Sequence, residues 1–199
     1  MGDRRIQGLI LAGGLSTRMG TDKALLPIAG KPLIYRLIEQ LSRLTEHVTV
    51  SVGSPEREAL YRESLGEWGE AVSFVIDDFP GCGPLSGLHA GLSSIGDGYV
   101  FTMACDMPEL SEELLSVLLA HTDSEADVIY APGQPFHALY HARAAAQIEA
   151  ALKTGDNRLM GLFNRLRTVV INWQEQGESS GFINLNTPAE YNKYIAENE

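Results

Sequence analysis

The 199-residue sequence is poor in cysteine, in long apolar runs and in positive charge, and each shortage argues against a class of protein. The two cysteines, Cys82 and Cys105, have no metal-type spacing, which is typical of incidental thiols in a reducing compartment. No stretch approaches the run of about 18 apolar residues that a membrane-spanning helix needs. The formal net charge of −11 argues against a general nucleic-acid binder and against a protein of anionic membrane surfaces.

The beginning of the sequence and its composition indicate a folded protein without a leader. MGDRRIQGLI contains two arginines but neither an apolar core nor a small-residue cleavage site, so no secretory signal is expected. The apolar fraction of 44% and the charged fraction of 21% are ordinary for a globular protein. We therefore expect one cytoplasmic domain over residues 1–199, with no nucleic-acid and no membrane partner.

Short apolar runs alternate with amphipathic stretches along the chain. Strands are predicted at residues 8–12, 47–53, 71–77, 99–106, 126–131, 135–141 and 168–173. Helices are predicted at residues 32–44, 54–65, 84–95, 111–122, 142–155, 157–166 and 187–199. Because helices separate the first five strands, the pattern indicates βαβ units and a mostly parallel sheet. The strand at 135–141 is expected to reach an edge of that sheet.

The residues that follow the predicted strands are the candidates for chemistry. In a parallel sheet the ligand crevice lies outside the carboxyl ends of the strands. Glycines and non-periodic acids concentrate after four of them, in residues 13–23, at Gly53, in residues 77–84 and in residues 106–108.

The first of these segments is too long and too charged for a simple strand-to-helix connection. Gly13 and Gly14 allow a sharp turn whose N–H groups can hold an anion, and Arg18 and Lys23 supply cations for phosphate oxygens. The segment matches neither the dinucleotide-binding fingerprint nor the P-loop. The alternative is a flexible surface loop, which the accompanying arginine and lysine disfavour.

LAGGLSTRMGTDK resembles the signature of the molybdenum cofactor guanylyltransferase (MobA type) family, at every specified position from Leu11 to Lys23. The resemblance implies a Rossmann-like three-layer α/β/α sandwich with a mostly parallel sheet. It also implies that Arg18 and Lys23 offset phosphate charge. Related cytidylyltransferases usually have alanine in place of Gly13, so this glycine favours guanine. The nucleotide-binding residues that the signature implies are Leu11, Ala12, Gly13, Gly14 and Lys23.

Two later segments agree with the same family. DDFPGCGPLSGLHAGL resembles its nucleotide-contacting segment and assigns that contact to Asp77, where a carboxylate suits the adjacent N–H donors of guanine. ACDMPEL matches its Cys-Asp-Met-Pro box, which gives Asp106 a place in catalysis, in nucleotide binding and as the Mg²⁺ ligand. The alternatives are ordinary turn residues at 77–78 and a helix cap at Asp106, for which Ser111 is better placed.

GFINLNTPAEY resembles the C-terminal signature of the family and implies that Asn184 and Asn186 bind the acceptor. Alternate residues of an extended segment face the same way, so both amides could point into one cleft. The alternative is a pair of turn-forming asparagines before a helix capped by Thr187. The loop after residue 131 is shorter than in the family. His89, His137 and His141 are interpreted as structural histidines.

The resemblance implies an enzyme that transfers GMP from GTP to the terminal phosphate of molybdopterin or Mo-molybdopterin and releases pyrophosphate. The expected cofactor is Mg²⁺. Besides the substrates, molybdenum-insertion proteins and molybdoenzyme chaperones are expected partners. Two alternatives remain open: another nucleotidyltransferase, such as a molybdopterin cytidylyltransferase, and a non-catalytic GTP-binding regulator.

Overall fold

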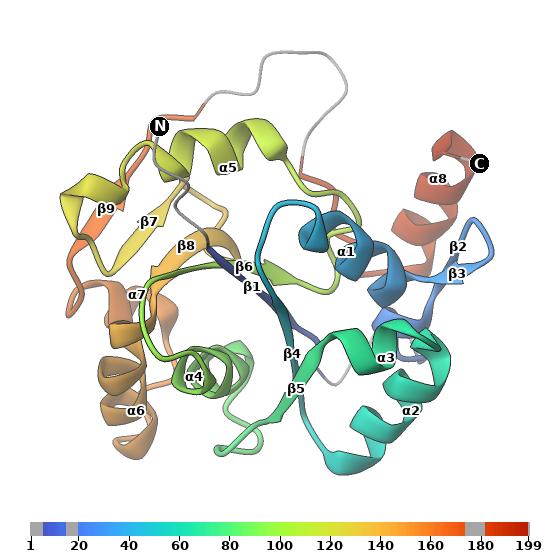
Figure 1. The fold of residues 1–199 in the computed structure, drawn as a ribbon, viewed down its shortest axis with the longest axis horizontal. Coiled ribbons are helices and arrows are strands. Elements are labelled where there is room, and N and C mark those ends of the chain that lie inside the picture. The colour runs from blue at the N-terminus through green and yellow to red at the C-terminus, as the bar shows by residue number, and fades with distance from the viewer. Residues whose placement is uncertain (1–5, 15–19, 174–181, 199) are drawn as a thin grey trace.

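A seven-stranded sheet forms the centre of the molecule, seen in a computed structural model that describes residues 6–14, 20–173 and 182–198 (Figure 1). Its strands lie in the order β5-β4-β1-β6-β8-β7-β9. Their bounds are β1 (Gln7–Leu11), β4 (Val48–Val52), β5 (Ser73–Ile76), β6 (Tyr99–Ala104), β7 (Val128–Tyr130), β8 (His137–His141) and β9 (Thr168–Val170). A separate antiparallel pair, β2 (Pro27–Ile28) and β3 (Lys31–Pro32), was not predicted.

The parallel part of the sheet is as predicted, whereas the position predicted for the strand at 135–141 is wrong. β5, β4, β1 and β6 pair in parallel, but β8 lies inside the sheet, antiparallel to both β6 and β7. Only residues 131–136 separate β7 from β8, and a parallel crossover needs about a dozen residues or more. The nearly continuous burial of HALYH is typical of an interior strand, and the edge is formed by β9 instead.

Helices cover both faces of the sheet (Figure 1). One face packs against α1, α2, α5 and α8, and the other against α4, α6 and α7. Side chains alternate along β1, so Ile10 joins the first core and Leu9 the second. The helix bounds are α1 (Leu33–Ser42), α2 (Pro55–Leu65), α3 (Trp68–Ala71), α4 (Pro84–Ser94), α5 (Glu112–Leu119), α6 (Ala145–Lys153), α7 (Leu159–Phe163) and α8 (Pro188–Asn198).

Local capping explains where several helices begin. Ser54 and Ser111 accept hydrogen bonds from backbone N–H groups of the first turns of α2 and α5. At α8, the Thr187 hydroxyl accepts from the Glu190 N–H, and the Glu190 carboxylate accepts from the Thr187 N–H, which makes a capping box before Pro188. These caps confirm the predicted starts of the three helices.

The parallel strands end together, which brings distant parts of the sequence to one edge of the sheet. The Ala12 N–H donates to the Ser51 carbonyl at 2.9 Å, and the Asp77 N–H donates to the Val52 carbonyl at 3.1 Å. On the other side of β1, the Cys105 N–H donates to the Leu11 carbonyl at 3.1 Å. The four segments that follow β1, β4, β5 and β6 are therefore neighbours, as the parallel arrangement predicts.

No helix within the described ranges is long and apolar enough to cross a membrane.

Both cysteines are free thiols of intermediate burial. Burial raises the pKa of Cys105 to about 12, and the adjacent Asp106 carboxylate acts in the same direction. A raised pKa of this size disfavours the reactive thiolate form at neutral pH.

Candidate active site

Lys23, Asp106 and Asn186 meet at the carboxyl edge of the sheet although they come from three distant parts of the sequence. The Lys23 ammonium donates to the Asn186 Oδ1 at 2.6 Å and lies 3.4 Å from the Asp106 Oδ2. The Lys23 side chain is 13% exposed and that of Asp106 is 25% exposed. The structure thus brings a nearly buried cation and a partly accessible carboxylate together, and the roles predicted for both residues stay predictions.

The C-terminal segment reaches this site through its backbone. The Leu185 N–H donates to the Asp106 carbonyl at 2.8 Å, and the Leu185 side chain is completely buried in the core. The Glu190 carboxylate accepts from the Asn186 N–H at 2.9 Å as part of the α8 capping box. The backbone at Asn186 is therefore fixed by the hydrogen bond of Leu185 before it and by the carboxylate of Glu190 after it. Asn184 is partly exposed on the other side of Leu185 and is not seen in contact with Lys23, so its assignment to the acceptor site stays a prediction.

A second carboxylate, Asp77, lies beside the glycine pair of the first loop. The Ser51 hydroxyl donates to the Asp77 Oδ1 at 2.8 Å, and Ser51 is completely buried at the end of β4. Burial raises the pKa of the Asp77 carboxyl above its ordinary value, while the Ser51 hydrogen bond and the charge of Arg57 oppose the shift. Asp78 is exposed and lies near His89 instead. Asp77 and not Asp78 thus lies beside Gly13, and its contact with the nucleotide stays a prediction.

Gly13 and Gly53 are required by the close approach of the strand ends. A Cβ at position 13 would lie 2.9 Å from the Asp77 Oδ2, and a Cβ at position 53 would lie 3.1 Å from the Gly13 carbonyl oxygen. A Cβ at position 14 would meet no atom of residues 6–14, 20–173 or 182–198 within 4 Å. Gly13 therefore leaves room for the Asp77 carboxylate, whereas a side chain at position 14 would not contact Asp77.

Arg57, Tyr61 and Ser51 belong to the site, and the sequence interpretation missed all three. Arg57, in the first turn of α2, forms an ion pair with Asp22 at 2.7 Å, and Tyr61 donates to the same carboxylate at 2.8 Å. The sequence held one indication. A cation in the first turn of a helix opposes the helix dipole, so an arginine there calls for a specific partner.

The structure describes some of the other predicted site residues and not all of them. Leu11 ends β1 and Ala12 follows it, both buried beside the glycine pair. Arg18 lies outside the described residues, so its contact with phosphate stays a prediction. His137 is completely buried with its Nε2 accepting from the Ser111 N–H, which fits the structural role expected of it.

The residues around Asp106 suit a Mg²⁺ ion that is bound largely through its substrate. Within residues 6–14, 20–173 and 182–198, no group of three or more His, Cys, Asp or Glu side chains is arranged to hold a metal. Mg²⁺ commonly binds through one or two carboxylates together with substrate phosphates and waters. Asp106 supplies one such carboxylate oxygen, and the Lys23 ammonium lies 3.4 Å from the Asp106 Oδ2.

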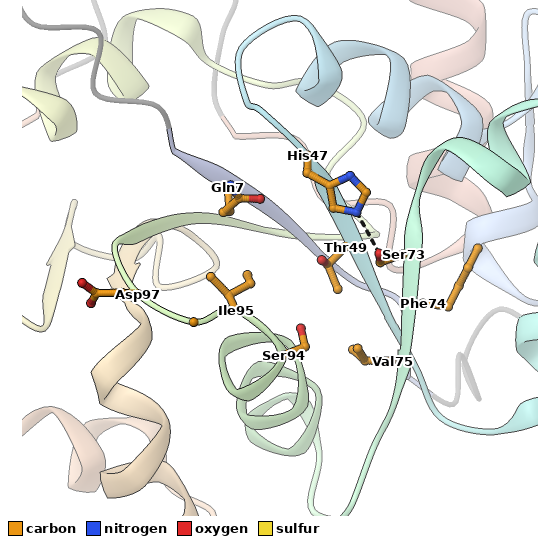
Figure 2. Close-up of a pocket in the computed structure, with 10 residues that line it drawn as sticks. Gln7, His47, Thr49, Ser73, Phe74, Val75, Ser94, Ile95 and Asp97 are labelled. Atoms are coloured by element: carbon orange, nitrogen blue, oxygen red, sulfur yellow. Dashed lines mark hydrogen bonds between the residues drawn. The ribbon is translucent and has the colours of Figure 1, made fainter.

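A separate cavity of about 450 Å³ lies at the opposite, amino end of the strands (Figure 2). Gln7, Thr49 and Ser73 line it from the starts of β1, β4 and β5, and Ser94 and Asp97 line it from the end of α4. It shares no residue with the site around Lys23.

Most of the chain is similar in sequence to one family of known proteins. The sequence model of the MobA-like NTP transferase domain matches residues 8–169. The molybdenum cofactor guanylyltransferase of Vibrio atlanticus is 31% identical over 191 residues, which cover 94% of this chain and 93% of the relative. A probable molybdenum cofactor guanylyltransferase of Natronomonas pharaonis is 34% identical over 196 residues, covering 94% and 95%.

Solved structures with the same fold include proteins of several related names. Molybdopterin-guanine dinucleotide biosynthesis protein A from Archaeoglobus fulgidus has a TM-score of 0.77 at 23% identity and covers 96% of this chain and 98% of its own. The 4-diphosphocytidyl-2C-methyl-D-erythritolsynthase from Anaerococcus prevotii has a TM-score of 0.68 at 16% identity, covering 98% and 96%. These likenesses confirm the predicted Rossmann-like α/β sandwich.

Proposed function

The chain belongs to the MobA-like NTP transferase family and is a nucleotidyltransferase, and we propose that it transfers GMP from GTP to the terminal phosphate of molybdopterin or its molybdenum-bearing form. The products are the guanine dinucleotide cofactor and pyrophosphate. The observation that carries the proposal is the position of Lys23, the last residue of the glycine-rich loop (residues 13–23), whose ammonium contacts both Asp106 and Asn186. The names of the relatives support the base and the acceptor.

The reaction needs no protein nucleophile. An oxygen of the acceptor phosphate attacks the α-phosphorus of GTP, the bond between this phosphorus and the oxygen bridging to the β-phosphate breaks, and pyrophosphate leaves with that oxygen. Catalysis then depends on orientation and on neutralising charge that develops on the phosphates. Lys23 supplies a cation in a nearly buried setting, where its attraction for phosphate oxygens is strengthened.

We assign one task in this reaction to each of Asp106, Asp77 and Asn186. Asp106 would hold Mg²⁺, which when bound would neutralise charge on the phosphates and favour departure of pyrophosphate. Asp77 would accept hydrogen bonds from the N1–H and N2–H of guanine, with Ser51 fixing its orientation. Asn186, held by the α8 capping box, would lie on the acceptor side together with Asn184.

Pyrophosphate release from the purified protein tests this function. The protein is incubated with Mg²⁺ and molybdopterin, and GTP is compared with CTP and ATP. Release with GTP that depends on the pterin supports both the base and the acceptor. Release with CTP instead would retain the mechanism but overturn the assignment of Gly13 and Asp77 to guanine. GTP binding without release under any condition would favour a non-catalytic regulator.

A further inference from the structure

Arg57 connects the two described ends of the glycine-rich loop. Its Nη1 donates to the Gly14 carbonyl at 3.0 Å, and its Nε and Nη2 donate to the Asp22 Oδ2 at 3.1 and 2.7 Å. Its Nη2 also donates to the Tyr61 hydroxyl at 2.8 Å. Gly14 follows β1 and Asp22 directly precedes Lys23, so one guanidinium joins the strand end to the turn that carries the lysine.

Burial and charge make this connection firm. The side chains of Arg57 and Asp22 are only 20% and 19% exposed, and Tyr61 is completely buried. Burial lowers the pKa of Arg57, but Tyr61 and the Asp22 carboxylate outweigh burial and raise the pKa overall. Charge-assisted hydrogen bonds of this kind are roughly twice as strong as neutral ones. Removing the guanidinium would leave the Asp22 carboxylate without its cation in a mostly buried setting.

The contact with Asp22 extends to Lys23. The Asp22 Oδ1 accepts from the Ala24 N–H at 3.1 Å and thereby caps the short 3₁₀ turn at Lys23–Leu25. The other oxygen of the same carboxylate is the one that Arg57 and Tyr61 hold. Arg57 thus fixes the backbone from which the Lys23 side chain extends toward Asp106 and Asn186.

We infer that Arg57 is a positioning residue for nucleotide binding, which keeps the Gly14 backbone and Lys23 arranged for the phosphates of GTP before the nucleotide arrives. The inference rests on the proposed function. Arg57 acts through other residues, because its four hydrogen bonds to Asp22, Gly14 and Tyr61 use all but one of the five N–H donors of a guanidinium.

This role predicts a particular kinetic signature. Without Arg57, the arrangement that binds GTP is populated less often, so the apparent affinity falls by that fraction while the bound complex still reacts. We expect Arg57→Ala to raise the KM for GTP by about tenfold, the factor that corresponds to 1.4 kcal/mol. The kcat should change less than about threefold, and the KM for the acceptor should stay the same.

Arg62 provides a matched control on the same helix. It also forms an ion pair with a carboxylate, Glu58 at 2.9 Å, and also donates to a glycine carbonyl, that of Gly69 at 2.5 Å. These contacts lie away from the glycine-rich loop, so Arg62→Ala should keep the wild-type KM for GTP. A rise in the KM for GTP that is equal in the two variants would overturn the inference.

Arg57→Lys keeps the charge but loses the fork geometry, and it provides a second variant if Arg57→Ala does not fold. A lysine ammonium is a single point charge and cannot hold the Gly14 carbonyl and Asp22 in the arginine arrangement. Arg57→Lys should therefore also raise the KM for GTP. A wild-type KM for Arg57→Lys, or a lowered kcat with an unchanged KM for Arg57→Ala, contradicts positioning by this guanidinium.

Hydrogen exchange separates failure of the inference from failure of the proposed function. If wild type and Arg62→Ala release no pyrophosphate, the proposed function fails, and the exchange measurement still tests the role of Arg57. Amides of residues 20–26 should exchange faster in Arg57→Ala than in Arg62→Ala in the absence of nucleotide. Equal exchange in the two variants would show that Arg57 does not hold this turn.

Discussion

Replacing Gly13 with alanine places a methyl group against the Asp77 carboxylate, which is proposed to bind the guanine base. The new Cβ would lie 2.9 Å from the Asp77 Oδ2, whereas ordinary van der Waals contact begins near 3.4 Å. The carboxylate or the Gly13 backbone must therefore move by about 0.5 Å. The carboxylate cannot move freely, because its other oxygen accepts from the buried Ser51 hydroxyl at 2.8 Å. The backbone at Gly13 does not have a positive φ, so the predicted effect is one of space alone.

The magnitude follows from these contacts. Overpacking of this kind typically costs about 1–3 kcal/mol, and a hydrogen bond to a charged group contributes about 1.5–3 kcal/mol. A displaced Asp77 would weaken its hydrogen bonds to the N1–H and N2–H of guanine. We expect Gly13→Ala to reduce the preference for GTP over inosine triphosphate, which lacks the 2-amino group, by about tenfold, equivalent to 1.4 kcal/mol.

The assay measures kcat/KM for pyrophosphate release with GTP and with inosine triphosphate. Gly14→Ala is the matched control, because its Cβ meets no atom within 4 Å in the part of the chain that the structure describes, Asp77 included. An alanine there that hinders the phosphates would lower kcat/KM for both nucleotides by the same factor and leave their ratio unchanged. An unchanged ratio for Gly13→Ala, or an equal loss of preference in Gly14→Ala, would refute the reasoning that links Gly13 to Asp77.

Three further predictions concern Lys23, Asp106 and His137. Lys23→Ala should lower kcat by roughly tenfold or more through loss of charge stabilisation, and a near-normal turnover rate would contradict that role. Asp106→Asn should abolish Mg²⁺-dependent transfer, checked by pyrophosphate release across a Mg²⁺ titration; an unchanged Mg²⁺ dependence would remove it as a ligand. Burial lowers the pKa of His137 from 6.5 to about 4, so the unfolded chain binds a proton first and stability should fall as pH drops from 6.5 toward 4. Denaturant unfolding should show a smaller loss over this range for His137→Gln; an identical loss would exclude His137 as its source.

The sequence was sufficient for the parts of the fold that depend on local patterns. Ser54, Ser111 and Thr187 cap the predicted helices because their side-chain oxygens act on N–H groups only a few residues away. The site residues after β1, β5 and β6 were also predictable, since parallel strands place their carboxyl ends together. Periodicity did not reveal the interior position of β8, which depends on the short connection after Tyr130.

The contacts that hold the site in place were not predictable from local patterns. Arg57 and Asp22 are 35 positions apart, and Ser51 and Asp77 are 26 apart. A hydrogen bond between side chains of distant residues leaves no periodicity in the sequence. The two segments from which Lys23 and Asp106 were identified contain neither Arg57 nor Ser51. The one indication in the sequence was indirect: a cation near the amino end of α2.

The hydrogen bond between Lys23 and Asn186 spans 163 positions of the chain, and this has a consequence for the order of events during synthesis. The ribosome delivers the glycine-rich loop, the sheet and Asp106 long before it delivers Asn186 and α8. A nascent chain can thus assemble most of its core with the lysine still lacking its amide partner, and the last contact closes the largest loop of the site. A nascent chain that does not yet include Asn186 therefore lacks the residue that is proposed for the acceptor side.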